Sequence, residues 1–200
     1  MGDFTIQFGR LVAYFGKDTD VVIPDNVTVI GRRAFYNKPI SSVVIPDSVV
    51  EIEQEAFMFA HLDRVELGRG VKKIGADAFL FNKDVIYSIY KQVPISVFAV
   101  SDRAHAAYHF LEGDNRKAYL PQVYEQNIAF LRKNLLKEIG YKRLYADEIA
   151  KNPDLMAEVF QGAKLPQRTV DGLLEHYLSV GRPDMIALLL QIRNTGGANK

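Results

Sequence analysis

The sequence predicts an α/β solenoid of short parallel strands followed by an all-α domain, and three observations support this fold class. A 22-residue repeat runs through the first half of the 200-residue chain. Hydrophobic residues recur at helical spacing from about residue 101 onward. A hydrophobic fraction of 48% can form a sizeable core. We therefore expect a hairpin and repeats over residues 1–95, a helical domain over 96–195 and a frayed tail over 196–200.

The N-terminal residues predict two short strands. Phe4 and Ile6 alternate with polar residues before Gly9, and Leu11, Ala13 and Phe15 alternate after it. Alternation of this kind around a glycine is typical of a β-hairpin.

The repeat aligns without gaps in three consecutive segments. They read VVIPDNVTVIGRRAFYNKPISS from Val21, VVIPDSVVEIEQEAFMFAHLDR from Val43 and VELGRGVKKIGADAFLFNKDVI from Val65. Five columns are identical: Val21/Val43/Val65, Val27/Val49/Val71, Ile30/Ile52/Ile74, Ala34/Ala56/Ala78 and Phe35/Phe57/Phe79. A period of this length indicates a solenoid, because one such unit cannot bury its own apolar side and must stack on its neighbours.

Spacing assigns a role to each repeat position. The alternating Val-x-Ile or Val-x-Leu at the start is a short strand, which Pro24 and Pro46 end because proline has no N–H for the ladder. Ala and Phe of the last columns close the unit against its neighbours. We predict a stack of Phe35, Phe57 and Phe79 with Phe57 fully buried.

These repeats resemble the BspA-like leucine-rich repeat family, whose units run as IPxxVxxIGxxAFxxxxL, and the match covers about residues 4–90. The resemblance implies that residues 4–16 form a hairpin that caps the first repeat, and that a helical region follows the repeats. The third unit departs from the pattern, with Gly68-Arg69 in place of Pro-Asp and Asp84 where the other units carry Ile40 and Leu62. We expect the register to slip by one residue there, and a fourth strand over Tyr87–Ile89.

The outward strand positions form the candidate partner-binding face. They make two rows, Asp20/Ser42/Arg64/Ile86 and Val22/Val44/Glu66/Ser88. Four strands ~4.8 Å apart and about three residues long cover on the order of 200 Å². A standard interface takes about 800 Å² per partner. We therefore expect either weak binding or an interface that also uses the helical domain, for example near His105 and His109.

The second half predicts several helices. Ser101 or Asp102 caps a helix whose apolar stripe is Ala104, Ala107, Tyr108 and Leu111. A longer helix runs from near Pro121 to Gly140, and shorter ones cover residues 144–150 and 155–160. A final pair is separated by Gly181 and Pro183, the usual punctuation between two helices.

The spacing of Asp102, His105, His109 and Glu112 is the only pattern that favours a metal site, because these four residues fall along one stripe of a helix. The alternative is a solvated rim beside the apolar stripe, and no second motif supports a metal. We therefore expect no metal and no other cofactor, and this stripe remains only a weak candidate.

Composition excludes several classes of function. The net charge of +1 favours neither a nucleic-acid nor an anionic-membrane partner, and the absence of Cys excludes thiolate catalysis and Cys-ligated zinc. No apolar run approaches the ~18 residues of a membrane span. The chain begins without a leader pattern, so we expect a cytoplasmic protein if it is full length, and an extracellular or surface protein if a leader was removed.

These observations favour a non-enzymatic protein-interaction module with an unidentified protein partner. The family resemblance implies the same, since its members are mostly binding or adhesion proteins, many at bacterial surfaces. Two alternatives remain: a small metal-dependent enzyme or a regulatory domain that uses the helical half.

Overall fold

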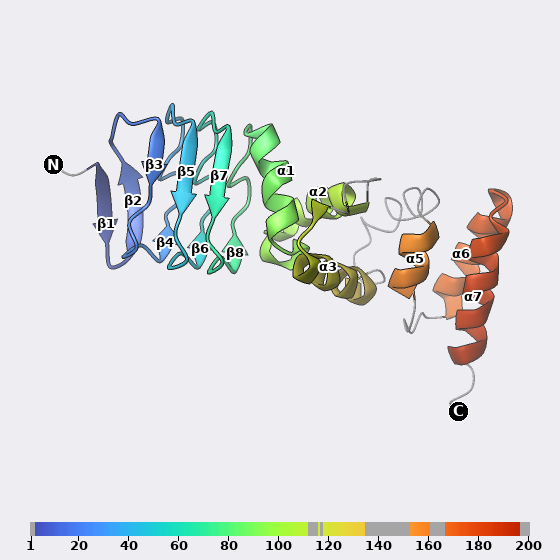
Figure 1. Ribbon diagram of the computed structural model, residues 1–200. Helices are drawn as coiled ribbons and strands as arrows, with labels where there is room; N and C mark the ends of the chain where they lie inside the picture. Colours follow the sequence, from blue (N-terminus) through green and yellow to red (C-terminus); the bar gives the residue numbers. More distant parts are fainter. Residues whose placement is uncertain (1–2, 112–115, 117, 135–152, 161–166, 197–200) are drawn as a thin grey trace.

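The computed structural model describes residues 3–111, 116, 118–134, 153–160 and 167–196. The repeat coils lie side by side at one end and the helices follow toward the other, with β1 and α7 at opposite ends (Figure 1). The strands are β1 (Phe4–Gln7), β2 (Arg10–Tyr14), β3 (Asp20–Val22), β4 (Val29–Ile30), β5 (Ser42–Ile45), β6 (Glu51–Ile52), β7 (Arg64–Leu67) and β8 (Lys73–Ile74). The helices are α1 (Lys83–Gln92), the 3-10 turn η1 (Ile95–Val97), α2 (Val100–Leu111), α3 (Pro121–Asn134), α5 (Pro153–Phe160), α6 (Gln167–Ser179) and α7 (Pro183–Gly196).

The strands form two sheets, and the N-terminal hairpin belongs to the one with the shorter repeat strands. β1 pairs with β2 antiparallel, and β2 pairs with β4 in parallel. The strand order is β1-β2-β4-β6-β8 in this sheet and β3-β5-β7 in the other. The hairpin therefore covers the N-terminal end of the repeat stack, as the family resemblance implied.

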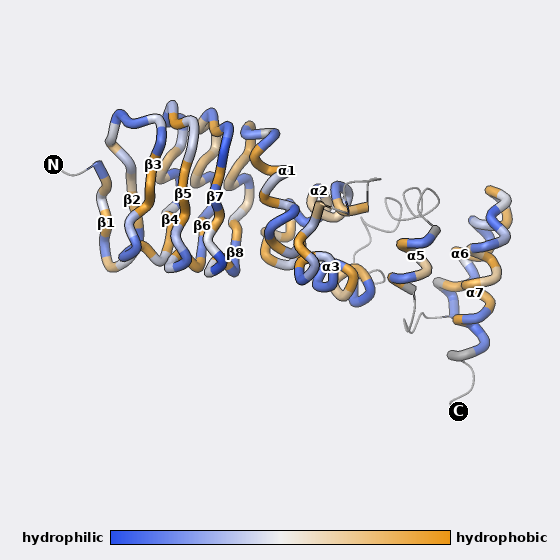
Figure 2. The backbone as a smooth tube through the Cα atoms, viewed as in Figure 1, coloured by the Kyte–Doolittle hydropathy of each residue, from blue (hydrophilic) through white to orange (hydrophobic). Residues whose placement is uncertain are grey.

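Each coil contributes one strand to each sheet and a turn segment on a third side. The turn segments also bond to one another: the Phe35 amide donates to the Ala56 carbonyl at 2.8 Å, and the Phe57 amide donates to Ala78 at 2.8 Å. All three sides of a coil are thus hydrogen-bonded to the next coil, which satisfies backbone groups that the stack buries. Hydrophobic residues fall at matching places in successive coils (Figure 2).

The identical columns of the repeat form the core. All fifteen of their side chains are at most 7% exposed. Phe57 is 0% exposed, and its ring stacks on Phe35 at 4.8 Å and on Phe79 at 5.0 Å between centroids. The predicted stack is confirmed, and Tyr14 of the hairpin extends it beyond Phe35 at 5.2 Å.

Two turn positions in every coil have left-handed backbone conformations without glycine. They are Arg33, Glu55 and Asp77 in one column and Asn37, Phe59 and Phe81 in the other. Their φ values lie between 53° and 67°. A positive φ is unusual for a residue as bulky as phenylalanine, so the path of the coil, rather than the local residue, imposes this conformation.

The departure of the third coil from Pro-Asp has a steric reason. A Cβ on Gly70 would lie 2.0 Å from the Asp47 carbonyl oxygen, and one on Gly68 would lie 2.4 Å from that of Pro46. The turn of the third coil therefore runs against the backbone of the second, where no side chain fits.

The predicted fourth strand over Tyr87–Ile89 is wrong, because helix α1 occupies this segment. Ile86 and Ser88 therefore lie on a helix and extend no strand row. Val85 and Ile89, spaced for one helix face, are both buried, and α1 packs against β7. Asp84 is exposed, so the inward position passes to Val85, a slip of one residue as expected.

The chain rejoins the stack after α1. Phe98 forms a parallel bridge with Ile74, and the Ala99 amide donates to the Ile74 carbonyl at 2.8 Å. This contact comes two residues later than a 22-residue period would place it. Helix α1 thus takes the place of the first strand of a fourth coil. The bridge between Phe98 and Ile74 retains part of the second, shorter strand.

Asn82 ends the repeating backbone pattern. In the first coil, the Ile40 amide donates to the main-chain oxygen of Ala60. In the next, the Leu62 amide donates instead to the side-chain Oδ1 of Asn82, at 2.8 Å. The Asn82 amide group donates to the Phe57 carbonyl at 2.8 Å. One buried side chain therefore supplies contacts that a further coil would otherwise make.

The helical half agrees with most of the predicted elements where the structure describes them, but α2 begins at Val100, so the expected caps Ser101 and Asp102 lie within its first turn. α3 begins at Pro121 as expected, and α5 begins at Pro153, two residues before the predicted start. Gly181 separates α6 from α7 with φ of 68°. The predicted end at Gly140 and the helix over 144–150 lie outside the described residues. In α2, Tyr108 is exposed rather than part of the buried stripe, because His109, Phe110 and Leu111 take the buried positions.

Candidate binding surface at the junction of repeats and helices

The strand rows exist across three strands in the predicted register. Asp20, Ser42 and Arg64 are aligned, as are Val22, Val44 and Glu66. Without the fourth strand, the face is smaller than expected from four strands. Its partner-binding role remains a prediction.

Polar side chains of the strand face already have partners. The Ser42 hydroxyl donates to the Asp20 carboxylate, and Arg64 lies 3.7 Å from Glu66 in an ion pair. Val22 is 67% exposed, but a single exposed apolar residue is common on protein surfaces. This face therefore offers little surface that requires a partner.

A groove lies where the third coil meets α1 and α2, and we call it the junction groove. Its volume is about 440 Å³. The coil lines it with Asp77–Asn82, α1 with Ile86, Tyr87 and Tyr90, and α2 with Asp102, His105, Tyr108 and His109. Cavities of about 300–1,000 Å³ with apolar and aromatic walls and a few polar groups are typical of binding sites.

Several aromatic rings at the junction groove are held by packing. Tyr87 stacks on His109 at 4.9 Å between centroids, and Tyr90 lies edge-on to Phe98 at 5.2 Å. His109 is buried, and its Nδ1 is 2.8 Å from the Tyr119 hydroxyl. Phe81 stacks on Phe59 at 4.2 Å yet is 62% exposed, whereas Phe59, with a similar left-handed backbone, is half-buried.

Two carboxylates supply negative charge to the groove. The Asp77 amide donates to the Asp102 Oδ2 at 3.0 Å, which ties α2 to the third coil. Burial raises the pKa of the Tyr90 hydroxyl, and the nearby Asp102 carboxylate raises it further. The phenol is therefore neutral and able to donate at physiological pH.

The predicted metal stripe does not converge in the part of the chain that the structure describes, where no three His, Asp or Glu side chains form a metal-binding group. His105 is exposed, whereas His109 is buried and Asp102 binds the Asp77 amide. Glu112 lies outside the described residues. The same helix instead places Asp102, His105 and His109 around the junction groove, together with Ile86 of the predicted strand face.

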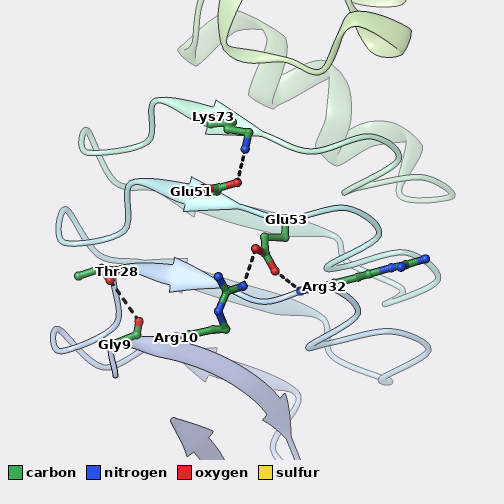
Figure 3. Close-up of polar contacts among 7 residues, drawn as sticks. All are labelled: Gly9, Arg10, Thr28, Arg32, Glu51, Glu53 and Lys73. Atoms are coloured by element: carbon green, nitrogen blue, oxygen red, sulfur yellow. Dashed lines mark hydrogen bonds and ion pairs between the residues drawn. The ribbon is translucent and has the colours of Figure 1, made fainter. Parts of the chain in front are cut away.

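The short-strand sheet carries charged pairs that link neighbouring coils (Figure 3). Glu53 pairs with Arg10 and accepts from the Arg32 amide at 2.8 Å, and Glu51 pairs with Lys73. These charges are mutually compensated, so this side has less to offer a charged partner than the junction groove.

A second groove lies on another side of the same junction. Its volume is about 990 Å³, and Arg69 and Lys72 of the third coil line it together with Leu120–Val123 and other helical residues. Its polar lining includes amide side chains such as Gln92 and Gln126. It lacks the aromatic walls of the junction groove among its described lining residues.

Sequence reasoning missed Asp77, Phe81, Tyr87 and Tyr108 as groove residues. The signal for Phe81 was present, since a second aromatic follows the core phenylalanine by two positions in the last two coils. The helical stripe assigned Tyr108 to the core, and the strand assignment gave Tyr87 the wrong geometry. The groove itself depends on α1, which the repeat pattern does not predict.

Comparison with known proteins identifies the repeats. The family model for a BspA-type leucine-rich repeat region of six copies matches residues 14–104 of this chain. This part of the chain is therefore a BspA-type leucine-rich repeat region, a class that indicates a protein-interaction module. No curated protein matches the chain.

Two solved structures are similar to part of the chain. The leucine-rich repeat protein of T. pallidum is 31% identical over 38% of this chain and 39% of its own, with a TM-score of 0.37. A leucine-rich repeat protein from Bacteroides capillosus is 29% identical over 50% of this chain and 84% of its own, with a TM-score of 0.41. The match thus spans well under half of the T. pallidum protein.

The helices of the described residues are short or too polar for a bilayer core. None of them combines the length and the apolar character needed to cross a bilayer.

Proposed function

We propose that this chain is a non-enzymatic interaction module that binds a protein partner through the junction groove. The observation that carries the proposal is a cavity of about 440 Å³, walled by aromatic rings, where the repeat stack meets α1 and α2. Aromatic side chains are enriched at interface hot spots, which lie in well-packed pockets. The strand face then serves as a scaffold or a minor contact.

The geometry favours the groove over the strand face for two reasons. The polar side chains of the strand face are paired with one another, whereas Phe81 and Tyr108 expose ring surface at the groove. A cavity can also enclose an anchor side chain, which a flat face of three short strands cannot do. A small groove provides a hot spot rather than a whole interface, so neighbouring surfaces complete the contact.

The test compares two variants of the full chain by capture from the source cell's lysate. Tyr108→Ala combined with His105→Ala alters exposed groove residues, and Val44→Glu combined with Arg64→Glu alters the strand face. We expect the groove variant to lose specific partners that the strand-face variant retains, with both melting temperatures near wild type. Retention of every partner by the groove variant would refute the proposal. Loss with the strand-face variant alone would assign the site to the strands.

A further inference from the structure

The junction groove combines aromatic walls with two carboxylates that no cationic side chain described by the structure pairs with. Among its described lining residues are the carboxylates of Asp77 and Asp102, but no lysine or arginine. Neither carboxylate forms an ion pair with any residue that the structure describes. This differs from the short-strand sheet, where Glu51 and Glu53 each face a cation.

The cation on α2 beside the groove is engaged elsewhere. Arg103 donates through Nε to the Phe98 carbonyl at 2.9 Å and through Nη2 to the Ser96 carbonyl at 3.1 Å. Its guanidinium also lies 5.8 Å from the centre of the Phe130 ring. The side chain therefore does not neutralise Asp77 and Asp102 from within the chain.

We propose that the junction groove binds an arginine side chain of the protein partner. The guanidinium would stack on the exposed rings of Phe81 or Tyr108 and donate to the carboxylates of Asp77 and Asp102. Arginine fits this chemistry better than lysine, because its planar group is weakly hydrated, stacks on aromatic faces and pairs with carboxylates through several donors. This assignment rests on the proposed function, since it names the group that the groove recognises.

Neutral variants of the two carboxylates can be made with little disturbance of the fold. Asp77 has φ of 57°, a conformation that asparagine adopts readily, so Asp77→Asn suits the backbone. Asp102→Asn keeps a side-chain oxygen that can accept the Asp77 amide. The matched control is Asp25→Asn with Asp63→Asn, which removes the same charge from exposed positions outside the groove.

The binding test uses short capped peptides and the full chain, followed by the amide resonances of groove residues. One peptide carries a central arginine between glycine and serine residues, and its partner carries citrulline, which has a similar shape without the charge. We expect the arginine peptide to bind at least about tenfold more tightly than the citrulline peptide, the scale of a cation over an aromatic ring with a carboxylate nearby. The double asparagine variant in the groove should remove most of that difference, while the control variant retains it.

Three outcomes would overturn the assignment. Equal binding of the arginine and citrulline peptides would show that charge plays no part. Equal weakening by the control variant would show a general effect of net charge. Methylguanidine binding as tightly as the peptide would show a site for a small cation rather than for a protein segment.

The lysate capture separates this inference from the proposed function. Loss of a partner with the Tyr108/His105 variant and also with the groove asparagine variant supports both. Loss with the first alone retains the groove as the interface but refutes the arginine. Retention with both refutes the proposed function itself.

Discussion

Each coil of the repeat stack makes the same contacts with the next coil, whereas each helix after Asn82 packs through contacts that occur once. The Phe57 ring and the Phe57 amide repeat, 22 residues later, what Phe35 does in the coil before. By contrast, Tyr124 donates to Glu158 at 2.7 Å, and Arg132 donates to the Val159 carbonyl at 3.1 Å, in pairings that no period generates. The coils thus need a neighbour of the same kind, and the helices need particular partners.

The difference explains why the boundary between the two regions is the most specialised part of the molecule. A repeating stack has no internal reason to stop, so its last coil would expose an apolar side. Asn82 and α1 replace the missing neighbour, and the irregular packing that results leaves the junction groove. Changes on either side of this boundary therefore test the contrast.

The largest effect should come from removing the helices. A fragment of residues 1–82 ends before α1 and leaves Val65, Ile74 and Phe79 on an open end. Because such apolar patches drive association, we expect the fragment to aggregate or to melt far below the full chain. Size-exclusion chromatography and thermal unfolding would measure this. A monomeric fragment with the melting temperature of the full chain would show that the coils do not need the helices.

A core substitution should come next in size. Phe57→Ala removes the middle ring of the stack and should lower the free energy of unfolding by ~3–5 kcal/mol, through lost burial and the cavity left behind. Phe81→Ala removes the same side chain from an exposed position and should cost less than about 1 kcal/mol. Denaturant unfolding of both variants provides the comparison. Similar losses would mean that the two phenylalanine columns are not inner and outer as described.

Asn82→Leu should have an intermediate effect, because it keeps the size of the side chain but removes its hydrogen bonds. The buried Leu62 amide would lose its acceptor, which costs ~1–3 kcal/mol. Asn26→Leu is the control, at an exposed position in the first coil. If chemical denaturation finds the two variants equally stable, the Asn82 side chain does not terminate the stack.

The smallest effect should come from the charged pairs of the short-strand sheet. Partial burial raises the pKa of the Glu53 carboxyl, but hydrogen bonds from Arg10 and the Arg32 amide outweigh it, so the net pKa is lowered. Glu53→Gln should therefore cost ~0.2–1 kcal/mol at neutral pH, as is usual for exposed pairs.

Unfolding at acidic pH tests whether the pKa of Glu53 is lowered in the folded protein. A carboxyl whose folded pKa is lowered stabilises the protein above its ordinary pKa, and this contribution is lost as pH falls through the folded pKa. The difference between Glu53→Gln and wild type should therefore shrink in acid, as measured by urea unfolding at neutral and acidic pH. A difference that grows on acidification would contradict the lowered pKa.

The repeat could be predicted from sequence because the same pattern of buried residues occurs in three consecutive segments. Identity of the columns at Val27, Ile30, Ala34 and Phe35 gave the period, the inward positions and the aromatic stack. The strand rows followed from the same register. The period ends after the third unit, and the strand predicted over Tyr87–Ile89 was wrong because this segment lies in α1.

The groove could be predicted only in part. The helical spacing of Asp102, His105 and His109 placed these residues on one helix, but it could not specify which of them face the last coil. That depends on how α2 rotates against α1, and the buried Phe110 and His109 fix this rotation rather than the tyrosine of the expected stripe. The left-handed turn at Phe81 is a property of the coil path, and the residue type at this position does not reveal it.

Asn82 and α1 together end the stack of coils, so the number of coils before them can be changed. Successive coils pair through the same backbone hydrogen bonds. A duplicate of residues 43–64 inserted after Arg64 would therefore find matching hydrogen-bond partners in the coils on both sides. The lengthened protein would keep its hairpin at one end and its groove at the other, moved apart by ~4.8 Å, the spacing of neighbouring strands. The distance between the N-terminal hairpin and the groove could thus be chosen by the number of coils, without altering the residues that line the groove.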